Sequence, residues 1–143
     1  MLKYNKVLPF GSQSLTYTLA DNQGLTNVQA EKYKYTYKIP EQFPEGATEK
    51  DIRIIAQLGD FIDDLSIFFE FHATRKSGNH IDELILYGGG ALLGNLDKYI
   101  RKVMNVPILR GMLLDNIEFD SDIPNTQELQ MYFYNCLGAL VNL

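Results

Sequence analysis

The sequence predicts an α/β fold with a small sheet covered by helices. Residues 84–87 form a short continuous apolar run, which is typical of a strand covered on both faces. That run ends in Gly88, Gly89 and Gly90, and the apolar residues after them recur at helical spacing: Leu92, Leu93, Leu96, Ile100 and Val103. A further apolar run over residues 106–109 indicates another strand. Strands that alternate with helices along a chain are typical of α/β layers.

The first strand is expected over residues 4–10. Val7 and Leu8 are apolar, and Pro9 is typical of an edge strand or of a strand end. A short helix over residues 14–20 is expected to follow it.

A second helix is predicted after a turn at residues 21–24, whose residue types tolerate a left-handed backbone or bond their own backbone. Thr26 and Gln29 form a capping box, in which each side chain reaches an otherwise unpaired backbone donor. The helix continues through residues 30–34. Two prolines and a glycine within residues 39–46 prevent it from going further.

The longest helix is predicted to begin after Thr48, with Glu49 and Asp51 in a first turn where carboxylates complement the helix dipole. Its apolar residues are dense enough to predict burial over a broad arc: Ile52, Ile54, Ile55, Leu58, Phe61, Ile62, Leu65, Phe68 and Phe69. No basic residues interleave with the phenylalanines, so these rings are interpreted as core rather than as a platform for nucleic-acid bases.

The last part of the chain predicts a loop and a helix. Residues 113–125 carry spaced carboxylates but lack the glycine and glutamate positions of an EF-hand, which favours a solvated loop. A final helix, capped by Asn125 or Thr126, is expected to turn one apolar face inward: Leu129, Phe133, Cys136, Leu137, Leu140 and Val141. Cys136 is therefore interpreted as a small buried apolar residue.

Length and composition predict a single globular domain over residues 1–143. A chain of 143 residues with 45% hydrophobic and 22% charged residues can bury a true core. The net charge of −5 and the scattered lysines and arginines argue against nucleic acid as a partner. Because there is neither an apolar stretch of ~20 residues nor a signal peptide, we expect no direct membrane insertion and a cytoplasmic location.

Neither a metal site nor a catalytic centre is predicted. His72 and His80 have no cysteine partners and do not match a common zinc spacing. Two histidines and scattered acids assemble neither a Ser-His-Asp triad nor a hydrolytic pair of carboxylates. Cys136 is the only cysteine, so no intramolecular disulfide forms.

The three glycines are interpreted either as a ligand-binding turn or as a tight turn that needs glycine for its geometry alone. Glycine lets a ligand approach the main chain, and the N–H groups of a following helix favour negative charge. The turn is not a P-loop, because Gly94 is followed by Asn95 rather than by lysine. It is not a Rossmann turn either, because Leu93 holds the place of the third glycine.

Four segments taken together resemble the actin-like ATPase superfamily. They are residues 6–16, the Ala-Glu-x-x-Lys helix at residues 30–34, the glycine-ended strand with its following helix and strand at residues 84–108, and the terminal helix at residues 135–140. The type IV pilus assembly protein PilM family is more similar than the related cell-division protein FtsA, because the distances between the segments are short. The resemblance implies an actin-like (ribonuclease H-like) second-half domain, with the chain as a fragment of that half.

The resemblance also implies ATP as the ligand. Gly88 and Gly89, with Gly90 beside them, would lie against the ribose and the α-phosphate, while Glu31 and Lys34 would reach the adenosine. A carboxylate can accept hydrogen bonds from ribose hydroxyls, and an ammonium group can donate to sugar or ring acceptors. The alternative for Glu31 and Lys34 is an ordinary solvated helix face.

Two departures from the family limit what is expected of the chain. The Asp-x-Gly-type hairpins that hold the β- and γ-phosphates and Mg²⁺ in this superfamily do not occur in it. Mg²⁺ is therefore expected to be held mainly by the missing half, and this chain alone is not expected to hydrolyse ATP. Asp63 stands where PilM relatives tend to have arginine, which reverses the charge at that place.

The function that the resemblance implies is that of a nucleotide-binding half-domain in a PilM-like cytoplasmic protein that helps to assemble the type IV pilus machinery. The implied partners are the tail of a PilN-like inner-membrane protein and the pilus motor apparatus, which would keep it at the inner face of the cytoplasmic membrane. Apolar area left by the missing half predicts self-association. One alternative is a degenerate, non-catalytic scaffold or interaction module. Another is an FtsA-like division protein, which calls for a basic amphipathic helix beyond Leu143.

Overall fold

A computed structural model describes residues 5–42, 44–75, 80–111, 129, 131–133 and 136. This part of the chain is mixed α/β and mostly helical, and it contains a two-stranded parallel sheet. The residues group into two compact units. The first unit consists of Met1–Lys34 and Gln42–His80, and the second of Tyr35–Glu41 and Ile81–Leu143. The predicted α/β class is confirmed at this level.

Helix α1 (Ser12–Gln23) is longer than the predicted helix at residues 14–20. It begins after Gly11, whose carbonyl accepts hydrogen bonds from the N–H and the hydroxyl of Ser14 at 3.0 and 2.6 Å. It ends at Gly24, whose left-handed backbone (φ 64°) is a common helix C-cap. Residues 21–23, predicted as part of a turn, therefore form the last turn of the helix.

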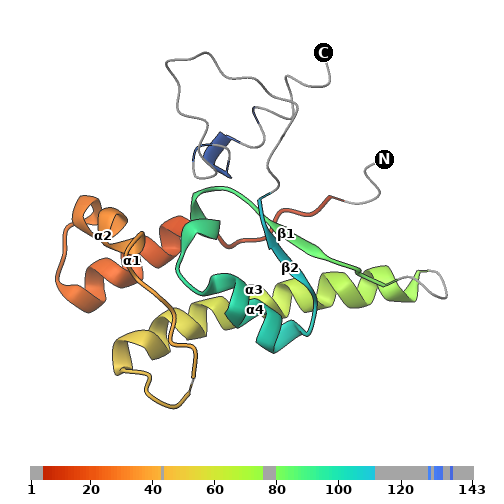
Figure 1. Cartoon of the computed structure of the whole chain (residues 1–143), viewed down its shortest axis with the longest axis horizontal. Helices are drawn as coiled ribbons and strands as arrows, with labels where there is room; N and C mark the ends of the chain where they lie inside the picture. Colours follow the sequence, from red (N-terminus) through yellow and green to blue (C-terminus); the bar gives the residue numbers. More distant parts are fainter. Residues whose placement is uncertain are drawn as a thin grey trace. The chain divides into compact units, whose positions relative to one another are not determined.

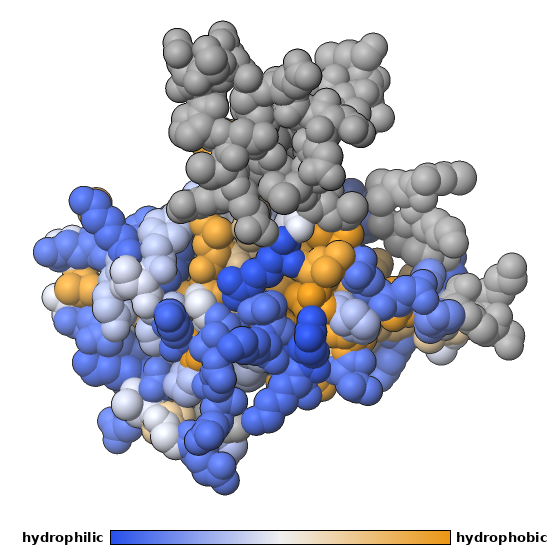
Figure 2. Space-filling model, in the orientation of Figure 1, coloured by the Kyte–Doolittle hydropathy of each residue, from blue (hydrophilic) through white to orange (hydrophobic). Residues whose placement is uncertain are grey.

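Helix α2 (Asn27–Lys34) carries the predicted capping box. The N–H of Thr26 donates to Oε1 of Gln29 at 2.9 Å, and the N–H of Gln29 donates to Oγ1 of Thr26 at 3.3 Å. The helix packs against α1 and buries Ala30 completely (Figure 1). Figure 2 shows that the surface of these two helices in view is mainly hydrophilic. One face of α2 is thus fixed in the core of the first unit.

Helix α3 (Glu49–Thr74) is the long helix of Figure 1, and it begins where the sequence predicts. Thr48 and Asp51 form a reciprocal capping box, with N–H to side-chain distances of 2.8 and 3.3 Å. Its buried apolar residues form a stripe: Ile54, Ile55, Leu58, Ile62 and Leu65. The predicted burial of Ile52 is wrong, since its side chain is 53% exposed. The reason is that α3 packs against α1 along one face, which leaves the rest of the predicted arc half-buried or open to solvent.

Residues 5–10 do not form the predicted strand. Val7 is 89% exposed, and Phe10 stacks on Phe61 of α3 with the ring centroids 4.8 Å apart. A strand needs a neighbouring strand to satisfy its backbone groups, and the described part of the first unit contains none. Aromatic packing against a helix therefore takes the place of strand pairing here.

The sheet of the second unit consists of β1 (Leu84–Leu86) and β2 (Ile108–Arg110), which run parallel with Ile85 opposite Leu109 (Figure 1). Both predicted strands are present, although the second begins two residues later than at residue 106. Every residue of β1 is half-buried, so the prediction of a strand covered on both faces is wrong. The physical reason is that, among the described helices, α4 (Leu96–Met104) packs mainly against β2, while the main contacts of β1 are with β2 itself.

The α-helix predicted directly after the glycines is interrupted. A 3-10 helix, η1, spans Gly89–Leu92, and α4 begins only at Leu96 after Asn95 takes a left-handed backbone with φ 62°. Leu93, Leu96 and Ile100 are buried as predicted, but Val103 is 52% exposed. The inward face of α4 is therefore the predicted one at Leu96 and Ile100, and it ends before Val103.

Gly94 explains the break between η1 and α4. It forms a parallel bridge with Lys38, donates its N–H to the carbonyl of Tyr37 at 3.2 Å and accepts the N–H of Ile39 at 2.9 Å. A Cβ at Gly94 would lie 2.8 Å from the Tyr37 carbonyl oxygen. The backbone of residues 37–39, which carries the buried Ile39, can therefore lie directly against residue 94 only because that residue has no side chain.

The acidic segment at residues 113–125 and the predicted caps Asn125 and Thr126 lie outside the described residues, as do Leu137, Leu140 and Val141. Residues 129, 131–133 and 136 are helical. Met131 is buried, whereas Phe133 is 51% exposed and Cys136 is exposed, so the predicted inward face is wrong for these two residues. Met131 takes the core position, because its side chain packs on Gly111. In the described part of the chain, no helix is both long and apolar enough to cross a membrane.

Candidate functional site

The glycine turn at the carboxyl end of β1 has a backbone that favours glycine. Gly88 has φ 87° and ψ 169°, a conformation that L-residues rarely adopt, and a Cβ there would meet no atom within 4 Å. Glycine is therefore favoured at this position by the backbone conformation and not by a lack of space for a side chain. In open α/β sheets, ligands bind in the crevice outside the carboxyl ends of the strands.

Neighbouring residues of the second unit occupy much of this turn. The N–H of Gly88 donates to the carbonyl of Met131 at 2.8 Å. A Cβ at Gly89 would lie 2.9 Å from Cε1 of Tyr132, so the phenol ring packs directly on the glycine backbone. The close approach that glycine permits is thus already used by the chain itself.

The helix dipole expected at the glycines is not provided by α4, which begins six residues after Gly90. The N–H groups of Gly89 and Gly90 stand in the first turn of η1, where a helix offers no acceptor of its own. The N–H groups of Gly89 and Gly90 are therefore the backbone donors that this turn could offer to an anion.

Arg110, at the end of β2, is a charged residue that the sequence analysis did not identify. Its guanidinium donates to the carbonyl of Leu93 at 2.9 Å and forms an ion pair with Asp97 in the first turn of α4. These contacts join the end of β2 to the chain that follows the glycine turn. The sequence of the strand does not predict this ion pair, because its partner Asp97 lies on a different element, α4.

Glu31 and Lys34 lie together on α2 and are joined to α1. Nζ of Lys34 donates to Glu31 at 2.8 Å, to Oγ1 of Thr16 at 3.0 Å and to the carbonyl of Ser12 at 3.4 Å. The Lys34 side chain is only 3% exposed, whereas that of Glu31 is 44% exposed. The alternative of an ordinary solvated helix face is therefore wrong for Lys34, whose ammonium group is engaged in the packing of α2 on α1.

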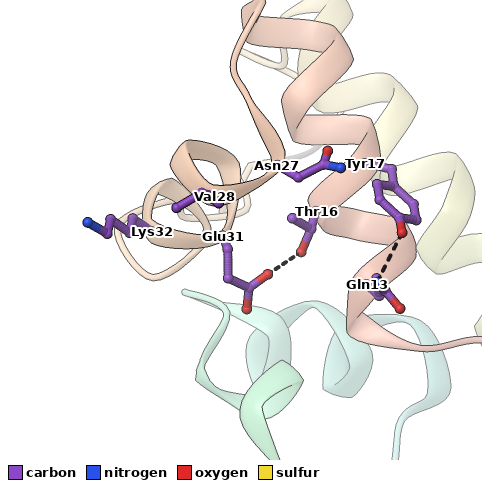
Figure 3. Close-up of a pocket in the computed structure, with 7 residues that line it drawn as sticks. All are labelled: Gln13, Thr16, Tyr17, Asn27, Val28, Glu31 and Lys32. Atoms are coloured by element: carbon purple, nitrogen blue, oxygen red, sulfur yellow. Dashed lines mark hydrogen bonds between the residues drawn. The ribbon is translucent and has the colours of Figure 1, made fainter.

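A pocket of about 380 Å³ opens between α1 and α2 beside the Glu31 carboxylate (Figure 3). Figure 3 shows the hydrogen bond from Thr16 to Glu31, 2.5 Å long, while the Lys32 side chain extends away from them. The lining residues are Gln13, Thr16, Tyr17, Asn27, Val28, Glu31 and Lys32. The arrangement offers hydroxyl groups of a ligand a fixed carboxylate acceptor in a partly apolar groove.

Asp63, where the family resemblance expects arginine, is exposed on α3. Among the residues that the structure describes, it takes part in no ion pair. The reversed charge is therefore a surface feature of α3.

The predicted site residues divide between the two units. Glu31 and Lys34 belong to the first unit, and Gly88, Gly89 and Gly90 belong to the second. Within the described ranges, no group of three or more His, Cys, Asp or Glu side chains is arranged to hold a metal ion.

Comparison with protein-family models and with curated protein sequences found no match to this chain. The family resemblance therefore depends on the four sequence segments alone.

Proposed function

We propose that this chain is the nucleotide-binding half-domain of a PilM-like, actin-fold protein of the cytoplasm, and that the full protein helps to assemble the type IV pilus machinery. In this proposal the partners are a PilN-like inner-membrane protein tail and the pilus motor apparatus, and they hold the protein at the inner face of the membrane. The ligand is ATP, with Mg²⁺ held mainly by the half that this chain lacks.

The backbone of Gly88 is the single observation that carries the proposal. A positive φ directly after a parallel strand is the geometry by which α/β proteins bring a main chain close to a phosphate-bearing ligand. The N–H groups of Gly89 and Gly90 would serve as donors to the α-phosphate and ribose.

The pocket beside Glu31 supports the adenosine part of the proposal. Thr16 and Lys34 hold the carboxylate in one orientation, so it would accept from the ribose hydroxyls without losing side-chain freedom on binding. Lys34 has a different role from the one that the resemblance implies. It is buried and would orient Glu31 rather than contact the ligand itself.

The residues present fit ATP in part. They offer backbone donors and a carboxylate acceptor, but no described cluster of carboxylates could hold Mg²⁺. Phosphoryl transfer requires the γ-phosphate, the metal and a water to be positioned together, so we expect binding without hydrolysis by this chain.

An NMR titration of the chain with Mg-ATP tests the proposal. Shifts of the amides of Gly88–Ala91 and of Glu31–Lys34 are expected, and few elsewhere. The variant Gly88→Ala should weaken binding, because alanine disfavours φ 87°. Gly46→Ala is the matched control: its φ is 79°, it too has no atom within 4 Å of an added Cβ, and it belongs to the first unit, whereas the glycine turn belongs to the second.

Gly46→Ala should reproduce the strain of Gly88→Ala and leave ATP binding unchanged. Equal losses of binding in the two variants would mean that general destabilisation, and not the turn, explains the effect. Absence of shifts at millimolar Mg-ATP in a folded chain would count against a nucleotide site formed by this chain.

A second candidate is a scaffold or interaction module that keeps the fold without the nucleotide. Tyr132 favours it, because its ring already fills the place beside Gly89. Saturation binding of ATP to a full-length protein that contains this chain separates the candidates, since a scaffold without a nucleotide site binds none at millimolar concentrations.

A further inference from the structure

Met131 and Tyr132 make two contacts with the glycine turn and one with Gly111 at the end of β2, all within the second unit. The carbonyl of Met131 accepts the N–H of Gly88 at 2.8 Å. The Met131 side chain packs on Gly111, where an added Cβ would be 2.9 Å from its Cγ. The Tyr132 ring packs on Gly89. Two glycines thus make room for two consecutive side chains of the same segment.

The ring of Tyr132 leaves no space for a ligand at Gly89. Its Cε1, Cδ1 and Cζ atoms would lie 2.9, 3.5 and 3.8 Å from a Cβ on Gly89. Carbon atoms in contact are about 3.5–4.0 Å apart, so nothing fits between the ring and the backbone. A ligand that approaches the main chain at Gly89 must first displace the ring.

The contacts of Tyr132 are consistent with a ring that can move while its backbone stays in place. Met131 is 3% exposed and anchors the segment, whereas Tyr132 is 40% exposed. Among the residues that the structure describes, the aromatic neighbour of the Tyr132 ring is Tyr35, which is also 40% exposed and lies edge-on with the centroids 6.2 Å apart. Rotation about the Tyr132 side-chain bonds away from Gly89 therefore breaks the contact with Tyr35 and uncovers the glycine backbone.

We infer that Tyr132 is an access residue for the glycine turn: its ring covers Gly89 in the free protein and swings out when a phosphate-bearing ligand binds. This inference rests on the proposed function and names the residue that limits its affinity. The apparent affinity equals the intrinsic affinity multiplied by the fraction of molecules in which the ring is out.

The test compares Mg-ATP titrations of the parent chain, of Tyr132→Ala and of Tyr132→Phe, followed by NMR at the amides of Gly88–Ala91. Tyr132→Ala should bind more tightly. A gain of about tenfold corresponds to a ring that covers the turn in about nine-tenths of the free molecules. Tyr132→Phe is the matched control, because it keeps the ring on Gly89 and loses only the hydroxyl, and it should bind as the parent does.

A second variant, Tyr35→Ala, removes the ring that contacts Tyr132 but keeps the contact between Tyr132 and Gly89. It should also tighten binding of Mg-ATP, by a smaller factor. It replaces Tyr132→Ala in the test if the NMR spectrum of Tyr132→Ala shows that this variant does not fold.

The outcomes separate the two proposals. Equal affinities of the parent and Tyr132→Ala, with shifts at the glycines in both, would leave the nucleotide site in place and overturn the access role. Weaker binding by Tyr132→Ala would also overturn it, since the ring would then contribute a ligand contact. No shifts in any variant would overturn the proposed function and the access role together.

Discussion

The ammonium group of Lys34 lies 2.8 Å from the carboxylate of Glu31, and the two side chains differ sharply in exposure, at 3% and 44%. A buried cation is thus paired with an anion that still faces solvent. The pair does not resemble an exposed ion pair between helix neighbours, because Lys34 also donates to Thr16 and to the Ser12 carbonyl on α1. Its main effect is to fasten α2 to α1.

Replacement of Lys34 should therefore destabilise the chain. Lys34→Met keeps the apolar stem but removes the hydrogen bonds that the ammonium group donates to Thr16, to the Ser12 carbonyl and to Glu31. We expect the free energy of unfolding to fall by about 2 kcal/mol. Urea unfolding followed by circular dichroism measures this change. Lys32→Met is the matched control on the exposed side of the same helix and should change stability by less than about 0.5 kcal/mol. Similar effects of both variants would contradict the fastening role of Lys34.

Gly94→Ala should destabilise the second unit. The added methyl group would meet the Tyr37 carbonyl oxygen at 2.8 Å and the Lys38 Cα at 3.1 Å, and backbone atoms cannot move aside as a flexible side chain can. We expect a loss of about 1–3 kcal/mol in the free energy of unfolding. Hydrogen exchange of the Ile39 amide, which donates to Gly94, gives a local measurement of the same effect. Unchanged protection of that amide from exchange would argue against the close backbone contact between residues 37–39 and Gly94.

Gly59→Ala should have the opposite effect on stability. Gly59 lies inside α3 with ordinary helical φ, and nothing lies within 4 Å of an added Cβ. Alanine at such a position is favoured over glycine by about 1 kcal/mol, so the thermal midpoint should rise. A fall in the midpoint would show that α3 needs glycine at this position.

Thr48→Ala should weaken the start of α3 by about 1 kcal/mol, because it removes the hydroxyl that accepts the Asp51 N–H. Thr48→Ser retains that hydroxyl and should restore most of the lost stability in the same unfolding experiment. If the serine and alanine variants unfold alike, the hydroxyl is not the source of the stabilisation.

Cys136 should react in the native state with a small thiol reagent, since the structure places it at the surface. We expect a labelling rate within about tenfold of that in denaturant, because exposure is the main barrier that folding adds. Cys136→Ser should change the free energy of unfolding by less than about 0.5 kcal/mol. Strong protection from labelling would instead support the buried position that the sequence pattern predicts.

Local patterns in the sequence determined where α2 and α3 of the first unit begin. The capping boxes of Thr26 with Gln29 and of Thr48 with Asp51 involve residues three positions apart, so the helix starts can be predicted without knowledge of anything distant. The strands β1 and β2 were predicted for the same reason, from short apolar runs bounded by glycine or proline. The glycine turn was identified as a special backbone position, and the positive φ of Gly88 is consistent with that.

Only the tertiary structure decided what these elements contact. Residues 5–10 look like a strand, but a strand also needs a partner, and Phe61 fixes the segment through an aromatic contact instead. Lys34 looks like a surface lysine until α1 supplies its acceptors. Gly89 looks like a place for a ligand until Tyr132, more than forty residues later, is found on it. Propensity and capping act within a few residues, whereas burial and access depend on residues that are distant in sequence and meet only in the folded chain.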